Sequence, residues 1–205
     1  MRTAAHALSI LLHPLWMTTL AVALCFWIDP YMYHGPGVEA RLVFLGMLFL
    51  MTAVFPLVSA LLMRRSGLVS DLTMPTRAER IPVYITGLLY HGMCWYLVRR
   101  ITDHPVTLGI LMGAFFTLLI ILLVTLRWKI SVHMAGIGGL IGAVLAAIVV
   151  DDRDAPLLLC ALFVLAGALG TARLVASDHT PAQVYAGALL GFACVFVCAG
   201  SGIVV

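Results

Sequence analysis

Two short stretches of the chain hold the residue types that could carry out chemistry. The stretch "KISVH", residues 129–133, contains Lys129 and His133, and the stretch "ARLVASDHTPAQ", residues 172–183, contains Arg173 and His179. An imidazole can attack phosphorus or transfer a proton, and a fixed cation stabilises the charge on phosphate oxygens. Two histidines beside fixed cations therefore favour phosphoryl transfer, provided that the fold brings the two stretches together.

The composition indicates which kind of fold must position these side chains. Of the 205 residues, 63% are hydrophobic and only 10% are charged, and the mean hydropathy is +1.11, whereas a soluble domain carries about a quarter charged residues. A helix needs about 20 apolar residues to cross a bilayer. The candidate spans, of which the third is short, are residues 7–28, 41–63, 83–98, 106–126, 133–150, 156–175 and 182–203. We therefore predict an all-α, polytopic transmembrane bundle of about six to seven helices that forms a single domain over residues 1–205.

Small residues predict which of these helices pack closely. In the fifth span, Ala135, Gly139 and Ala143 recur at every fourth position, and small residues have the same spacing in the sixth and seventh spans. Such spacing lets helix backbones approach each other in lipid. We expect the fifth, sixth and seventh helices to form one tight cluster. Only the connection 64–82 is long enough to hold structure of its own, and we expect a short interfacial helix there.

The predicted topology divides the charged residues unequally between the two faces of the membrane. Seven crossings put the connections 64–82, 127–132 and 176–181, together with the N-terminus, on one face. That face carries eight basic and three acidic side chains, a net charge of +5, and the other carries four basic and six acidic ones, a net charge of −2. A cationic face suits an anionic ligand. The positive-inside rule would put it in the cytoplasm, but without its four candidate ligand-binding cations each face has four basic residues, so the orientation stays open.

His133 and His179 both lie at the predicted start of a helix on this cationic face. Helix N-termini present unpaired N–H groups and the positive end of the helix dipole, so anions collect there. Ionisable side chains near bilayer depth are costly and are usually functional. The residues themselves thus predict a phosphate-binding cluster on the cationic face.

These stretches, in this order, resemble the membrane branch of the type 2 phosphatidic acid phosphatase superfamily. The family pattern is K-x6-R-P, then P-S-G-H, then S-R-x5-H-x3-D, and the resemblance covers residues 64–190. In the third motif Arg173 and His179 keep the family spacing, but Ala172 replaces its serine and Gln183 stands where the family has aspartate. The segment "HTPAQVYAG" is similar to the dolichyl-diphosphatase subgroup, which also carries glutamine at that position.

The first two motifs match more loosely. The second keeps the Ser-x-His spacing in Ser131 and His133, with isoleucine and valine in place of the family's proline and glycine. The first lies in "DLTMPTRAERIP", which offers Arg77 and Arg80 with an isoleucine inserted before the proline. The family's lysine is missing there, and Arg77 or Lys129 would supply its charge.

The resemblance implies a metal-independent lipid phosphatase that needs no cofactor. In such an enzyme His179 attacks phosphorus to form a phosphohistidine, and His133 protonates the departing lipid oxygen. Gln183 would orient His179, and the neighbouring Asp178 would compensate for the missing carboxylate. The side chains implied to hold the phosphate are Ser131, Arg80, Arg173 and either Arg77 or Lys129. The implied substrate is a polyprenyl diphosphate or a phospholipid phosphate, the implied partners are membrane lipids and not nucleic acid, and the expected location is a bacterial inner membrane.

Other interpretations of the same residues stay open. A binding or scaffold protein could keep the fold without the chemistry, because the family's aspartate, serine and proline are replaced. A small transporter is disfavoured, since the sequence has no inverted repeat and no polar stripe along a pore. The motif His13–Pro14 predicts a kink in the first helix, and His91, in the middle of the third span, needs a polar partner. The turn "DDRDAP", residues 151–156, is expected to be solvated rather than to bind a metal ion.

Overall fold

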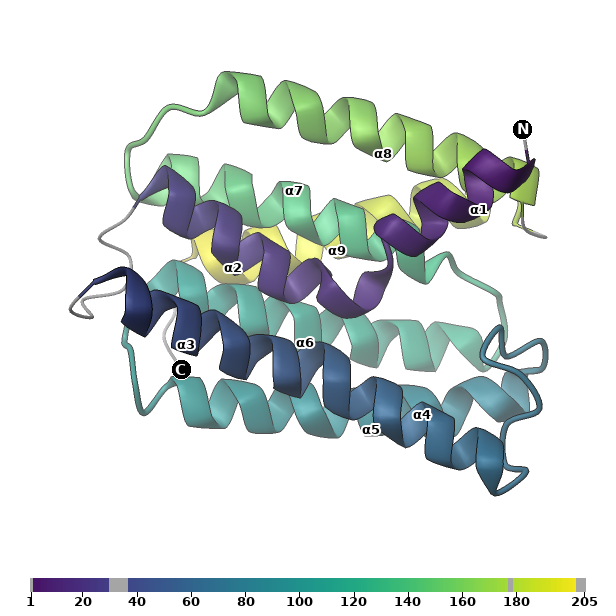
Figure 1. The fold of residues 1–205 in the computed structure, drawn as a ribbon. Coiled ribbons are helices and arrows are strands. Elements are labelled where there is room, and N and C mark those ends of the chain that lie inside the picture. Colours follow the sequence, from purple (N-terminus) through teal and green to yellow (C-terminus); the bar gives the residue numbers. More distant parts are fainter. Residues whose placement is uncertain (1, 30–36, 177–178, 202–205) are drawn as a thin grey trace.

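The computed structural model describes residues 2–29, 37–176 and 179–201 (Figure 1). Within these ranges all regular structure is helical, and seven helical stretches are long and apolar enough to cross a membrane. The predicted all-α, polytopic bundle is therefore confirmed. The elements are α1 (Arg2–Leu11), η1 (Pro14–Trp16), α2 (Met17–Ile28), α3 (Val38–Phe49), η2 (Leu50–Val54), α4 (Phe55–Arg65), α5 (Arg77–Val98), α6 (Pro105–Thr125), α7 (Val132–Val150), α8 (Pro156–Ala176) and α9 (Pro181–Gly200).

Each of the first two spans is interrupted along its length. Pro14 restricts the residue before it to an extended conformation, and His13 accordingly has φ −73° and ψ 138°. The helix α1 therefore ends at Leu11, and the 3₁₀ turn η1 leads into α2. In the second span η2 is a π-helical turn, a local widening that is frequent at functional sites. The helix α1, before the first interruption, packs against α8, and α4, after the second, runs beside α5 (Figure 1).

The helix α9 packs most closely, on α7 and on α6. A Cβ atom added at Gly138 of α7, at Gly191 of α9, or at Gly109 or Gly113 of α6 would run into backbone atoms of a neighbouring helix in this cluster. The predicted packing of the fifth helix (α7) on the seventh (α9) is confirmed. The sixth helix (α8) also contacts α7 and α9, and a Cβ at Gly170 would meet side-chain atoms of Val184 and Met134 at ordinary contact distances, from 3.5 Å. It therefore joins the cluster less tightly than expected, and the fourth helix (α6) packs more closely on α9.

The helix ends on the predicted cationic face lie together. The ends of α4, α6 and α8 and the starts of α1, α5, α7 and α9 meet at one end of the bundle (Figure 1). The third span begins at Arg77 rather than at residue 83, because Thr76 caps it: Thr76 Oγ1 accepts a hydrogen bond from Glu79 N at 3.4 Å. Residues 66–76 form turns without a helix, so the expected short interfacial helix within 64–82 is wrong.

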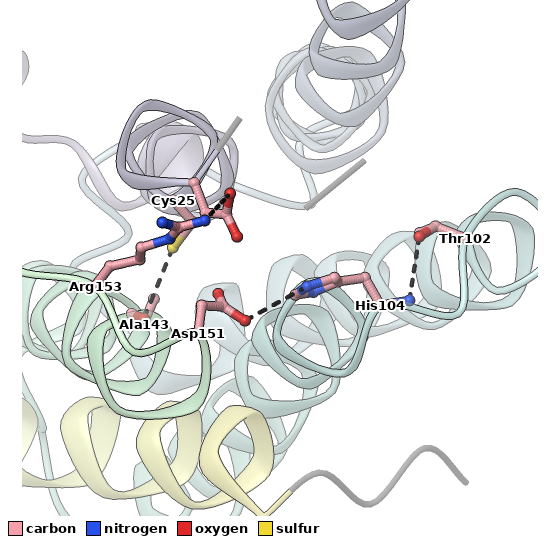
Figure 2. A network of polar contacts seen from close by, with 7 residues as sticks. Cys25, Thr102, His104, Ala143, Asp151 and Arg153 are labelled. Atoms are coloured by element: carbon pink, nitrogen blue, oxygen red, sulfur yellow. Dashed lines mark hydrogen bonds and ion pairs between the residues drawn. The ribbon is translucent and has the colours of Figure 1, made fainter. Parts of the chain in front are cut away.

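At the opposite end of the bundle, two ion pairs tie the helix ends together (Figure 2). Arg153 Nη2 lies 3.4 Å from Asp29 Oδ1, and His104 Nε2 lies 3.6 Å from Asp151 Oδ1. Burial raises the pKa of Asp151 above its ordinary value, against the opposite influence of His104. This network joins the ends of α2 and α7 to the start of α6, far from the cationic end.

Candidate functional site

A cavity of about 650 Å³ lies inside the cationic end of the bundle and extends between the helices. Five of the side chains singled out in the sequence line it together: Arg80, Lys129, His133, Arg173 and His179. These residues come from α5, the α6–α7 connection, α7, α8 and the start of α9. The fold therefore brings the two histidine-containing stretches, which are far apart in the chain, to one cavity.

The hydrogen bonds around His179 fix which of its ring nitrogens carries the proton. Thr180 and Gln183 form a capping box at the start of α9: Gln183 N donates to Thr180 Oγ1 at 3.4 Å, and Thr180 N donates to Gln183 Oε1 at 3.1 Å. His179 Nδ1 lies 3.1 Å from the same Oε1. Because this atom of Gln183 already accepts a hydrogen bond from a backbone N–H, it must be the amide oxygen and not the amide nitrogen. An amide oxygen only accepts, so His179 Nδ1 must be the donor. The lone pair of neutral His179 is therefore on Nε2.

The surroundings of His179 also keep its ring neutral. The pKa of His179 is lowered to about 4, chiefly by burial; the hydrogen bond to Gln183 acts in the opposite direction, and the cations Arg173, Lys129 and Arg80 add to the lowering. At neutral pH the imidazole is thus uncharged and can act as a nucleophile. The three cations line the same cavity as the ring, as a phosphate-binding cluster requires.

Arg80 has a second task, which is to hold the connection between α4 and α5. Its side chain is buried, and Nε donates to Met74 O at 2.8 Å while Nη2 donates to Pro75 O at 3.0 Å. Met74 and Pro75 themselves line the cavity. The guanidinium therefore closes one wall of the cavity in addition to placing a positive charge beside it.

His133 and Arg173 both contact the first helix through Ser9. His133 Nε2 lies 3.2 Å from Ser9 O, and Arg173 Nη1 donates to Ser9 Oγ at 3.3 Å. The ring of His13 packs edge-on against the ring of His133, with centroids 5.2 Å apart and an interplanar angle of 79°. Ser9 and His13 line the same cavity.

Three other predicted site residues, Ser131, Arg77 and Gln183, do not line the cavity. Ser131 is fully buried, its N–H donates to Gln183 O at 3.2 Å, and its hydroxyl has no hydrogen-bond partner among the described residues. Arg77 is exposed and donates to Leu126 O at 3.3 Å. Gln183 acts on the site through His179, and Asp178 lies outside the described residues.

Sequence reasoning missed part of the cavity wall. Ser9 carried no signal, and His13 appeared only as a kink, although both contact the predicted site. His91 lines the deeper part of the cavity, where its Nδ1 lies 2.9 Å from Gly87 O and its Nε2 lies 3.4 Å from Thr18 Oγ1. The polar partner that His91 requires is therefore Thr18 of α2, together with a carbonyl of its own helix.

Comparison with protein-family models, with curated proteins and with solved structures finds no match to this chain. Fold and cavity define the class: an all-α integral membrane protein with a cationic, histidine-lined cavity at one end of its bundle.

Proposed function

We propose that this protein is a membrane lipid phosphatase that removes phosphate or diphosphate from a lipid headgroup through a phosphohistidine intermediate. The observation that carries the proposal is the neutral, oriented ring of His179, which shares a cavity with His133 and with three fixed cations. The resemblance of the motifs to the type 2 phosphatidic acid phosphatase superfamily points to the same chemistry. A bacterial inner membrane is the proposed location.

The proposed reaction has two steps at phosphorus. In the first, the lone pair of His179 Nε2 forms a bond to phosphorus, the bond from phosphorus to the lipid oxygen breaks, and His133 gives that oxygen a proton. In the second, the oxygen of a water molecule forms a bond to phosphorus while His133 takes a proton from it, the bond from phosphorus to His179 Nε2 breaks, and inorganic phosphate leaves. Arg173, Lys129 and Arg80 stabilise the charge on the phosphate oxygens, where an arginine can donate two parallel hydrogen bonds.

The walls of the cavity favour a lipid over a soluble phosphate compound. Away from the cations the lining is largely apolar and includes Met17, Ile110 and Leu140. Two further lining residues, Ile10 of α1 and Leu57 of α4, are 66% and 41% exposed, so the lining of the cavity extends to the surface of the bundle. A cavity of about 650 Å³ is of a size that binds small molecules. A phosphate with an attached apolar chain fits both parts.

One observation favours a second candidate function, a lipid-phosphate-binding protein without activity. Gln183 orients His179 but cannot neutralise the imidazolium, whereas a carboxylate could. A protein that binds the headgroup and does not hydrolyse it would keep the cations and lose turnover.

Phosphate release by the purified protein separates the two functions. Wild type, His179→Ala and the control His104→Gln, at the other end of the bundle, are assayed with a polyprenyl diphosphate, phosphatidate and phosphatidylglycerol phosphate, each with and without EDTA. We expect release by wild type and by the control, and only background release by His179→Ala. Background release by all three proteins, with retained binding of the lipids, would replace the phosphatase by the binding protein. Release that disappears in EDTA would refute the metal-independent mechanism.

A further inference from the structure

We infer that Ser9, in the last turn of α1, is a positioning residue of the site, because it holds both the proton donor His133 and the phosphate-binding Arg173. This inference rests on the proposed function for the roles of the two partners. The contacts themselves belong to α1, outside the stretches that carry the motifs.

The break after α1 makes the carbonyl of Ser9 available. The last carbonyl groups of a helix have no partner within the helix, and Pro14 prevents α1 from continuing. Two side chains contact these carbonyl groups: Trp16 Nε1 donates to Leu11 O at 2.8 Å, and His133 Nε2 lies 3.2 Å from Ser9 O. The kink predicted from His13–Pro14 therefore has a consequence for the site.

The contact with Ser9 determines the proton position on His133. A carbonyl oxygen only accepts hydrogen bonds, so Nε2 of His133 carries a hydrogen in the neutral and in the protonated ring. Only Nδ1 then gains and loses a proton. We therefore assign the exchange of protons with the lipid oxygen, and later with water, to Nδ1 of His133.

The side chain of the same residue contacts the cation. Ser9 is 6% exposed, and its Oγ accepts a hydrogen bond from Arg173 Nη1 at 3.3 Å. One buried residue thus links a histidine of α7 with an arginine of α8, and the packing of α1 on α8 keeps it there. Loss of the hydroxyl should remove this hydrogen bond from the guanidinium without changing the carbonyl that orients His133.

The substitution Ser9→Ala tests the hydroxyl, with Ser9→Thr as the conservative variant. The matched control is Ser59→Ala, which removes a helix-to-helix hydrogen bond of 3.0 Å to Tyr90 outside the cavity. We expect Ser9→Ala to raise KM for the lipid phosphate, and to weaken binding of inorganic phosphate, about ten-fold, the loss expected for a hydrogen bond to a charged group. The kcat should stay near that of wild type, because Arg173 holds the phosphate in both the ground state and the transition state. Ser9→Thr should restore both values, and Ser59→Ala should change neither.

Nitrogen NMR of protein labelled with ¹⁵N-histidine tests the carbonyl, with His133→Gln to assign the signal. The neutral ring of His133 should carry its proton on Nε2 in wild type and in Ser9→Ala. A proton on Nδ1 would overturn the assignment.

The outcomes distinguish this inference from the proposed function. An active wild type with unchanged KM and phosphate binding in Ser9→Ala would overturn the inference and leave the phosphatase intact. Ten-fold weaker phosphate binding in Ser9→Ala, without lipid hydrolysis by wild type, would support Ser9 and overturn the phosphatase. No phosphate binding by wild type would overturn both. If Ser9→Ala does not fold, Ser9→Cys replaces it, since the thiol has a similar size and is a weak acceptor.

Discussion

The substitution Gln183→Glu changes the charge beside His179 and almost nothing else. In the protein, Oε1 of Gln183 accepts two hydrogen bonds, from Thr180 N and from His179 Nδ1, each at 3.1 Å. A glutamate oxygen can accept both bonds from the same position, so the start of α9 should keep its capping box. A carboxylate, however, stabilises the imidazolium form, which the neutral amide cannot do to the same extent.

The size of the effect follows from the surroundings of the ring. Burial and three cations hold the pKa of His179 at about 4. A carboxylate within hydrogen-bonding distance raises a neighbouring pKa by roughly one to three units, which gives about 5 to 7 in Gln183→Glu. Because the neutral ring is the nucleophile, the acidic limb of kcat/KM should move up with this pKa. At pH 5 the loss relative to wild type should lie between about two-fold and a hundred-fold, and at pH 8 it should vanish.

The assay is the pH dependence of kcat/KM for phosphate release between pH 4 and pH 8. Gln183→Leu is the control, since it removes the acceptor without adding a charge. It should lower kcat over the whole range, because the ring loses its fixed tautomer, and should not move the acidic limb upward. Acidic limbs that coincide in wild type and Gln183→Glu would refute the reasoning that neutral His179 attacks phosphorus.

Three further predictions concern the helices around the site. His13→Asn retains an acceptor for the N–H at the start of η1 but removes the ring beside His133, so kcat should fall with KM unchanged, while thermal denaturation shows an unchanged Tm. Gly191→Ala forces α7 and α9 apart and should cost about 1–3 kcal/mol, seen as a lower Tm, whereas Gly167→Ala, with nothing within 4 Å, should not lower it. Asp151→Asn should change the Tm more favourably at pH 8 than at pH 4. The raised pKa of Asp151 means that its charged form, which is populated as pH rises, destabilises the folded protein. The opposite pH trend would contradict burial as the cause of the raised pKa.

The sequence predicted the membrane spans because each is a long apolar run, but it misjudged where polar residues belong to a helix. Arg77 and Arg80 were assigned to a connection, although "TRAE" at residues 76–79 has the spacing of a capping box, which starts α5 at Arg77. The close packing of α6 on α9 was also missed. Small residues are present in both α6 and α8, and only the three-dimensional packing decides that those of α6 meet the backbone of α9.

The order of the motifs and the number of membrane crossings between them allowed part of the candidate site to be predicted. These two features put His133 and His179 at the same end of the bundle, and the fold brings them to one cavity. The role of Ser9 could not be predicted in this way, because its contacts depend on how α1, which precedes the break at Pro14, packs against α8. The tautomer of His179 could not be predicted either, since it follows from a shared hydrogen-bond acceptor at the start of α9.

Localising the covalent intermediate tests the central claim most directly. The purified protein is mixed with a lipid phosphate, quenched in alkali to preserve any phosphohistidine, digested, and mapped by mass spectrometry. We predict phosphate on His179 in wild type and none in the peptide of His179→Ala. Steady release of phosphate without a modified His179, or with the phosphate on His133 instead, would contradict the account.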